Sequence, residues 1–138
     1  MMKINGSCHC GKITFEADID PNKVRICHCI DCQKLSGTAF RTTVMSEPNG
    51  VTFITGSAKE YIKIAANGNR RAQGFCPDCG SSLYATTENE KNRIYGIRVG
   101  TLEQRNELTP RFQIWCRSAF PWLQSINSLP AFETSPNN

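Results

Sequence analysis

The stretch Cys27-His28-Cys29-Ile30-Asp31-Cys32 places three thiols within six residues. Core packing does not require such a cluster, whereas three close thiols can converge on one Zn²⁺. Three protein ligands leave the fourth tetrahedral position free for water or substrate, which is typical of catalytic rather than structural zinc. The alternative is a closed site whose fourth ligand is His28 or a distant residue. We interpret the stretch as an open metal site, with the rest of the chain as its frame.

Two further pairs of cysteines stand far apart in the chain. Cys8 and Cys10 form a C-x-C motif, and Cys76 and Cys79 form a C-x-x-C motif followed by Gly80. Together the two pairs would supply the four thiolates of one closed structural site, which leaves the central three cysteines intact. A rival grouping joins the C-x-x-C pair to two central cysteines, but it leaves three cysteines without partners. A redox role for the C-x-x-C motif is disfavoured, because no βαβ pattern surrounds it.

The remaining cysteine and the two histidines are predicted to stay outside both metal sites. Cys116 lies between Trp115 and Arg117 with no second cysteine nearby, so we expect it to be a buried small hydrophobic side chain. His9 and His28 each stand between two cysteines, and in an extended backbone they would point to the opposite face. We therefore expect them to support the ligands or lie on the surface rather than bind metal.

Length and cysteine usage favour one domain in a reducing compartment. A chain of 138 residues suits a single domain with its own core. No apolar run reaches the length of a membrane span, and the N-terminal residues lack the apolar core of a secretion signal. Eight cysteines would suit a disulfide framework outside the cell, but their tight spacing favours metal binding in the cytoplasm.

The net charge argues against a nucleic-acid partner. The formal value of +4 counts the cysteines as neutral, and it falls to about +1 once seven thiolates and two Zn²⁺ are included. The cations at Arg70, Arg71 and within residues 111–117 are scattered, without a long basic run. A non-catalytic zinc module that binds nucleic acid or a protein partner is nevertheless the alternative to an enzyme. A zinc-stabilised fold whose labile second metal senses thiols is a third interpretation.

Short strands separated by turn residues predict a mainly β protein. We expect breaks at Asp20-Pro21-Asn22 and at Glu47-Pro48-Asn49-Gly50, and Asn67-Gly68 predicts a hairpin. Residues 33–36 suggest one helical turn, and residues 102–108 a weak helix of two turns. The expected strands are residues 4–8, 12–17, 24–27, 38–45, 51–54, 59–64, 71–75, 83–86 and 94–99.

Several motifs together resemble a known family. They are Gly6-Ser7-Cys8-His9-Cys10-Gly11, Cys27-His28-Cys29 with Cys32, Ser36-Gly37-Thr38-Ala39-Phe40, Phe75-Cys76-Pro77 with Cys79-Gly80-Ser81, and Trp115, Ser118, Pro121-Trp122 and Leu129-Pro130 near the C-terminus. The series resembles the glutathione-dependent formaldehyde-activating enzyme (GFA) family, or centromere protein V/GFA domain. Gln113 stands where many members carry histidine, and Asn127-Ser128 stand where an acidic residue and glycine are usual.

The resemblance implies a fold and two zinc ions. The fold would be a β-tent of small antiparallel sheets stapled by zinc, with residues 1–133 as a single GFA-like zinc-binding domain and 134–138 as a frayed C-terminal tail. A structural zinc would be held by four cysteines and a catalytic zinc by three. The structural set is Cys8, Cys10, Cys76 and Cys79, and the catalytic set is Cys27, Cys29 and Cys32.

The resemblance also implies carbon–sulfur lyase chemistry. The partners would be a small thiol such as glutathione and a small aldehyde, as in formation of S-hydroxymethylglutathione from formaldehyde. An open zinc position suits this reaction, since a metal can acidify a thiol or polarise an aldehyde. Lys34 and Arg41 could offset the charge of a three-thiolate zinc site, although solvated surface charge is the favoured interpretation for each. Ser36-Gly37-Thr38 could donate hydrogen bonds to a substrate or form a plain turn.

Overall fold

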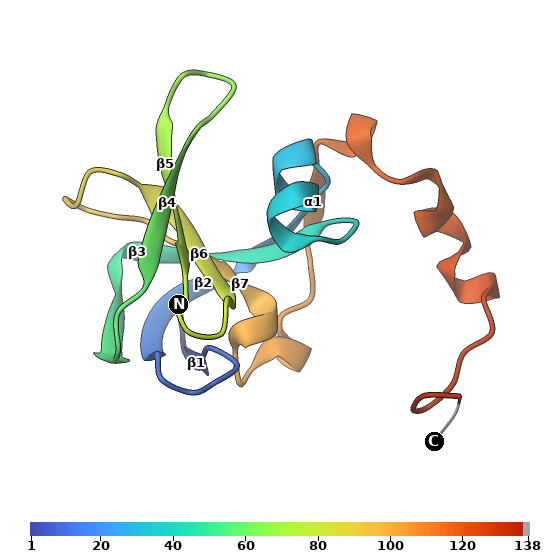
Figure 1. The fold of residues 1–138 in the computed structure, drawn as a ribbon, viewed down its shortest axis with the longest axis horizontal. Coiled ribbons are helices and arrows are strands. Elements are labelled where there is room, and N and C mark those ends of the chain that lie inside the picture. The colour runs from blue at the N-terminus through green and yellow to red at the C-terminus, as the bar shows by residue number, and fades with distance from the viewer. Residues whose placement is uncertain (137–138) are drawn as a thin grey trace.

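Strands dominate residues 1–136, the part of the chain that the computed structural model describes (Figure 1). Residues 1–136 contain a single α-helix, α1 (Ile30–Ser36). The strands are β1 (Met2–Ser7), β2 (Thr14–Cys27), β3 (Arg41–Thr55), β4 (Lys59–Ile64), β5 (Arg70–Phe75), β6 (Ser82–Thr87), β7 (Gly96–Arg98) and β8 (Phe112–Ile114). The 3₁₀ helices are η1 (Val99–Thr101), η2 (Arg105–Glu107), η3 (Cys116–Ser118) and η4 (Pro121–Ser128).

The strands follow one hydrogen-bonded path in the order β1-β2-β3-β7-β6-β5-β4. Neighbours along this path are antiparallel, whereas β8 joins β2 in parallel. The prediction of a mainly β fold with antiparallel pairing is confirmed. The β4–β5 hairpin is also confirmed, with Gly68 at φ 86° in its turn.

The two faces of the sheet differ because side chains alternate along each strand. Val24, Val44 and Ile97 lie in register across β2, β3 and β7, and all three are buried in the hydrophobic core. Burying each such side chain contributes roughly 1.5–3 kcal/mol. Arg25 and Thr43 form the next register pair and line a cleft on the other face. The same strands therefore build the core and present polar groups to the cleft.

Two expected strand breaks were wrong. Asp20-Pro21-Asn22 lies inside β2, where the pairing with β3 shifts register between Ile19 and Val24. Glu47-Pro48-Asn49-Gly50 lies inside β3, where Asn49 has a φ of 54°. Turn residues in a long strand can cause a local bulge and bend without ending the pairing. The expected short strands on each side of these sites are thus parts of two long ones.

The expected helix at residues 102–108 was also wrong. This segment contains η2 and a buried Leu102 in extended conformation, with a ψ of 142°. The next residue, Glu103, donates its backbone N–H to the Asn5 carbonyl at 2.9 Å. This tertiary contact outweighs a weak helical propensity. By contrast, the helical turn expected at residues 33–36 is part of α1.

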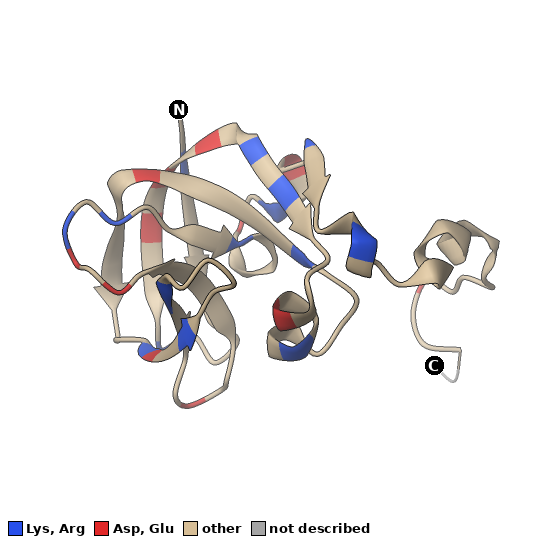
Figure 2. Ribbon diagram, turned by 90° about the horizontal axis from the view of Figure 1, so that it is seen from above, with Lys and Arg blue, Asp and Glu red and all other residues tan. Residues whose placement is uncertain are grey.

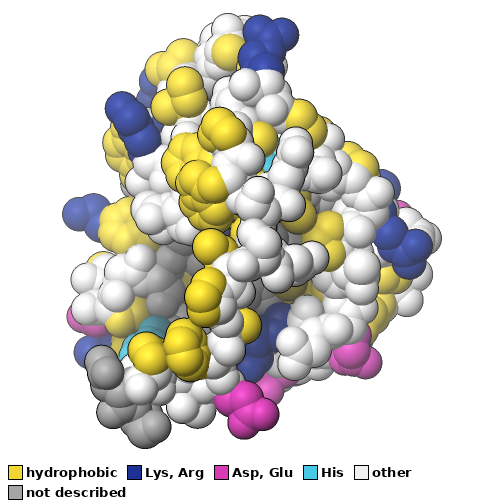
Figure 3. All heavy atoms as spheres, turned by 90° about the vertical axis from the view of Figure 1, so that its right-hand side faces the viewer, with side chains coloured by type: hydrophobic (Ala, Val, Ile, Leu, Met, Phe, Trp, Pro, Cys, Tyr) yellow, Lys and Arg dark blue, Asp and Glu magenta, His cyan; other side chains and the backbone are white. Residues whose placement is uncertain are grey.

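The C-terminal arm, residues 119–136, extends away from the sheet (Figure 1). It contains no Lys or Arg and appears tan over most of its length in Figure 2. Trp122, Leu129 and Phe132 on the arm are exposed, and Figure 3 shows hydrophobic side chains on this side of the molecule. The single domain at 1–133 and the frayed tail at 134–138 stay predictions, and Asn137 and Asn138 lie outside the described residues.

No helix among residues 1–136 combines the length and apolar character required to cross a membrane.

Candidate functional site

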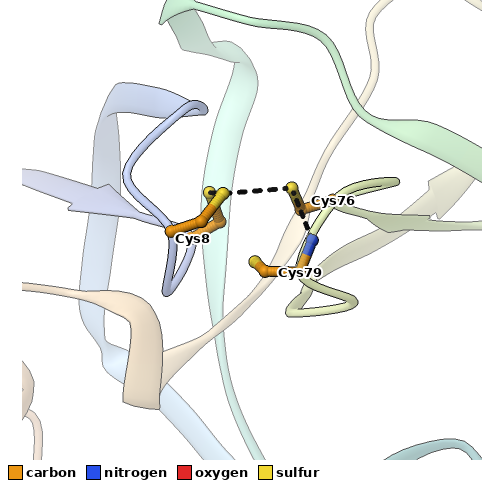
Figure 4. Close-up of side chains that lie close together, drawn as sticks. Cys8, Cys76 and Cys79 are labelled. Carbon is orange, nitrogen blue, oxygen red and sulfur yellow. Dashed lines mark hydrogen bonds between the residues drawn. The ribbon is translucent and has the colours of Figure 1, made fainter.

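The first cysteine cluster joins two distant parts of the chain. Cys8 and Cys10 come from the loop after β1, and Cys76 and Cys79 come from the loop between β5 and β6 (Figure 4). Their sulfur atoms all lie within 4.8 Å of one another. The Sγ atoms of Cys8 and Cys10 are 3.6 Å apart, and those of Cys10 and Cys76 are 3.8 Å apart. Four thiols at this separation could hold one metal ion.

Backbone groups around the four-cysteine cluster favour thiolates. The N–H of Ile13 donates to Cys8 Sγ at 3.3 Å, and the N–H of Cys79 donates to Cys76 Sγ at 3.5 Å. Ser81 Oγ lies 3.2 Å from Cys79 Sγ, and hydrogen bonding by Ser81 is the main cause that lowers the pKa of Cys79 to about 5. Because donors stabilise the charged sulfur, these residues suit a metal-binding site.

The second cluster is local and forms where α1 begins. Cys27 ends β2, Cys29 is the N-cap of α1, and Cys32 lies in its first turn. Cys29 Sγ accepts the backbone N–H of Cys32 at 3.3 Å, so one of the thiols also caps the helix. The three Sγ atoms lie within 4.8 Å of one another. Among the described residues no histidine or carboxylate joins this group of potential ligands.

A buried cation contacts the three-cysteine cluster. Arg41 is 7% exposed and its Nη2 donates to Cys32 Sγ at 3.3 Å. The pKa of Cys32 is lowered to about 5, first by hydrogen bonding with Cys27 and further by Arg41. Hydrogen bonding with Cys32 is the main cause that raises the pKa of Cys27, and burial raises it further. The expectation of solvated surface charge was therefore wrong for Arg41, whereas Lys34 is exposed.

The three-cysteine cluster opens into a cleft of about 550 Å³. One wall comes from the tip of the β4–β5 hairpin and another from Ile114 and Trp115. The polar face of the sheet provides much of the remaining lining. Its cations are Arg25, Arg41, Lys63, Arg71 and Arg98, and the described lining contains no Asp or Glu. The cleft is therefore a cationic chamber beside three thiols.

Arg98 is held in this chamber by neutral oxygens. Its Nη1 donates to Thr43 Oγ1 at 3.0 Å, and its Nη2 donates to Gln73 Oε1 at 2.9 Å. Burial lowers the pKa of Arg98 to about 9, and the nearby Arg41 contributes to that shift. Two arginines fixed on the sheet thus make this face favourable for negative charge.

Hydrogen bonds of neighbouring residues hold the three-cysteine cluster and α1 in place. His28 is buried, and its Nε2 lies 2.7 Å from Gln113 Oε1. Gln33 Nε2 donates to the carbonyls of His28 and Ser118, each at 2.9 Å, and so ties α1 to the segment after β8. Gln113 therefore forms a hydrogen bond at the position where many family members carry histidine. Ser36 Oγ donates to the Cys32 carbonyl at 2.6 Å, as in a plain helix end.

Two sequence predictions fail for identifiable reasons. Cys116 is exposed rather than buried, because it starts η3 directly after Trp115, which takes a left-handed φ of 58° as the chain leaves the sheet. Apart from Arg41, the basic residues of the cleft were not predicted to lie beside the cluster. Arg25 could have been found from its place two residues before Cys27, since alternate strand residues share a face. Arg71 and Arg98 gave no such signal, because their strands reach the cleft only through the sheet topology.

Comparison with known proteins gives a consistent result. The family model described as glutathione-dependent formaldehyde-activating enzyme matches residues 3–118. An uncharacterized lyase of Schizosaccharomyces pombe is 28% identical over 95 residues, which span 69% of this chain and 66% of that protein, slightly less than two thirds. A crystal structure of a Rhodobacter sphaeroides protein has the same fold, with a TM-score of 0.60 and 18% identity over 79% of this chain and 98% of that one. The chain belongs to the glutathione-dependent formaldehyde-activating enzyme family.

Proposed function

We propose that this protein is a zinc-dependent carbon–sulfur lyase that joins a small thiol to a small aldehyde, as in the formation of S-hydroxymethylglutathione. The observation that carries the proposal is the three-cysteine cluster at the wall of the cationic cleft. Cys8, Cys10, Cys76 and Cys79 would hold a structural zinc, and Cys27, Cys29 and Cys32 a catalytic zinc. Membership of the family supports lyase chemistry on glutathione and an aldehyde.

The donor sets suit the proposed metal. Thiolates are good ligands for zinc, and within each cluster the sulfur atoms lie close enough together to bind one ion. When bound to three cysteines, Zn²⁺ supplies Lewis acidity at a fourth position that the protein leaves to water or substrate. A single protein with a four-thiol and a three-thiol set thus combines a closed site and an open one.

The chain's own side chains would perform the remaining tasks. Arg41 holds the negative charge of the cluster through Cys32, and Cys29 is fixed in place as the helix N-cap. Trp115 and the hairpin tip limit the space beside the sulfurs, so a thiol and an aldehyde bound there would be kept close together. The reaction forms a C–S bond, and the thiol proton passes to the aldehyde oxygen. A reducing compartment such as the cytoplasm would keep the cysteines free to bind metal.

The test is the rate of adduct formation above the uncatalysed reaction. Zinc-loaded protein should accelerate the exchange of formaldehyde with its glutathione adduct, measured at equilibrium by NMR exchange spectroscopy. Cys32→Ser should lose the acceleration, whereas Cys116→Ser, which removes an exposed thiol, should keep it. Equal rates for wild type and Cys32→Ser would reject the lyase proposal. If the wild-type protein does not accelerate the reaction but retains DNA or RNA in a salt-sensitive manner, a nucleic-acid-binding zinc module is favoured instead.

A further inference from the structure

Two arginines of the cleft have no acidic partner in the described part of the chain. Arg25 lies on β2, two residues before Cys27, and Arg71 lies on β5. Both line the cleft and both are partly buried. Within residues 1–136 neither guanidinium makes an ion pair or a side-chain hydrogen bond. Partly desolvated cations without partners are unfavourable unless an anion joins them.

The two arginines line the same cleft, and the charge of one acts on the other. Burial is the larger cause that lowers the pKa of Arg71, and the charge of Arg25 is the second. Strands β2 and β5 are not neighbours in the sheet, so the two arginines enter the cleft from different strands. The two positive charges repel each other in the cleft, and an anion bound between them would attract both guanidinium groups.

The other cations of the cleft already have partners. Arg41 donates to Cys32, and Lys63 forms a 2.7 Å ion pair with Asp31. Arg98 donates to neutral oxygens of Thr43 on β3 and Gln73 on β5. Arg41 Nε and Nη1 and Arg98 Nε also lack a partner, but each of these two side chains is already held by at least one hydrogen bond. Arg25 and Arg71 are therefore the two arginines of the described lining whose guanidinium groups make no side-chain hydrogen bond at all. A guanidinium can bind a carboxylate through two parallel hydrogen bonds.

We propose that Arg25 and Arg71 form an anion-binding pair that holds a carboxylate of the thiol substrate while its sulfur lies at the three-cysteine cluster. Arg25 and Cys27 share one face of β2, with Cα atoms about 6.8 Å apart in a regular strand. A flexible thiol with a carboxylate several bonds from its sulfur can reach both. The inference rests on the proposed function and specifies the substrate as an anionic thiol.

The direct test uses S-methylglutathione, which has both carboxylates of glutathione but no thiol. Its affinity for zinc-loaded protein is measured by calorimetric titration for wild type, Arg25→Gln, Arg71→Gln and Arg111→Gln. Arg111 is exposed and outside the cleft, so Arg111→Gln is a matched control for the loss of one positive charge. Either cleft variant should weaken binding by about tenfold to a hundredfold, the value of a charge-assisted hydrogen bond. The control should bind like wild type.

Circular dichroism and zinc content of the variants identify any loss of fold. If Arg25→Gln is not folded, Arg71→Gln decides the matter, because Arg71 lies on β5 and not on β2, the strand that ends at the three-cysteine cluster. Equal affinity in wild type and the folded cleft variants would overturn the inference. So would an equal loss in Arg111→Gln, or the absence of binding to wild type.

A kinetic comparison separates this inference from the proposed function. The substrates are 3-mercaptopropionate and the neutral 3-mercapto-1-propanol, which differ in the carboxylate and have the same chain length. Wild type should prefer the anionic thiol by at least tenfold in kcat/KM, and Arg71→Gln should lose that preference, measured as the ratio of its kcat/KM values for the two thiols, whereas Arg111→Gln should keep it. Equal acceleration of both thiols by wild type would overturn the anion site and leave the lyase proposal intact. If neither thiol is accelerated, the lyase proposal fails and the titration alone decides the anion site.

Discussion

The two cysteine clusters use the same kind of side chain in opposite ways. Cys10 and Cys76 are 66 positions apart in the sequence, so the four-cysteine cluster ties the loop after β1 to the loop between β5 and β6. The three-cysteine cluster lies within six residues at the start of α1. A metal that closes a long loop restricts the unfolded chain strongly, whereas a local cluster restricts it little. We therefore expect the first site to stabilise the fold and the second to be free for chemistry.

The surroundings of the clusters support the same division. The sulfurs of the four-cysteine cluster accept backbone N–H groups of Ile13 and Cys79, which belong to the two loops that it joins. The three-cysteine cluster instead contacts the buried guanidinium of Arg41 and opens into the cationic cleft. Backbone donors from the two loops therefore surround the four-cysteine cluster, whereas positively charged side chains surround the three-cysteine cluster.

Loss of a ligand from the four-cysteine cluster should have the largest effect. Cys79→Ser should leave unfolded or insoluble protein, because structural zinc contributes about 10–16 kcal/mol, as much as the whole stability of a typical domain. Circular dichroism and zinc content measure the outcome. A folded Cys79→Ser variant that binds wild-type amounts of zinc would show that the four-cysteine cluster is not required for the fold.

The corresponding change in the three-cysteine cluster should spare the fold. Cys32→Ser should keep the β spectrum of wild type, lose one zinc and reduce the rate of adduct formation by about 100-fold or more. The reason is that α1 and β2 remain anchored by the sheet and by Gln33. Collapse of Cys32→Ser to the same extent as Cys79→Ser would remove the case for two different roles.

Removal of the cation beside the cluster should have an intermediate effect. Arg41→Met keeps a long apolar side chain but deletes the donor to Cys32, so the affinity for the second zinc should fall about tenfold to a hundredfold. Competition with a colorimetric chelator measures this affinity separately from activity. Arg41→Lys, which restores the charge but not the guanidinium, should recover part of it. Unchanged zinc affinity in Arg41→Met would show that the cation does not support the cluster.

Removal of the eighth cysteine should have the smallest effect. Cys116 is exposed and stands outside both clusters. Cys116→Ala should therefore keep the zinc content of wild type and change the free energy of unfolding by no more than about 0.5 kcal/mol, as for other surface substitutions. Loss of one zinc per chain would mean that the cysteines are grouped incorrectly.

Sequence reasoning was most successful where the signal is local. Strand β4 was predicted with its observed bounds, and the grouping of seven cysteines by spacing agrees with the two clusters of close sulfur atoms. Alternation and thiol spacing act over a few residues, so they can be read without a structure. The metal identity and the catalytic role of Cys27, Cys29 and Cys32 stay predictions.

The failures arose where distant contacts decide the outcome. Pro21 and Pro48 suggested strand ends, but pairing between β2 and β3 continues past both through register shifts and a positive φ. Arg41 was predicted to be a surface cation, but it is buried, because the start of β3 lies beside the three-cysteine cluster. Cys116 was predicted to be buried because a free cysteine without a second cysteine nearby usually packs as a small hydrophobic side chain. It is exposed because it starts η3, just before the C-terminal arm. None of these contacts is visible in the local sequence.

The most direct test of the two roles is a titration of Co²⁺-substituted protein with glutathione. Cobalt at a thiolate site absorbs in the visible and near-ultraviolet range, and its spectrum changes when a new ligand binds. We predict that one of two cobalt ions responds in wild type and that the response disappears in Cys32→Ser, while the spectrum of the four-cysteine site stays constant in both. A response at the four-cysteine site, or an identical response in wild type and Cys32→Ser, would contradict the account.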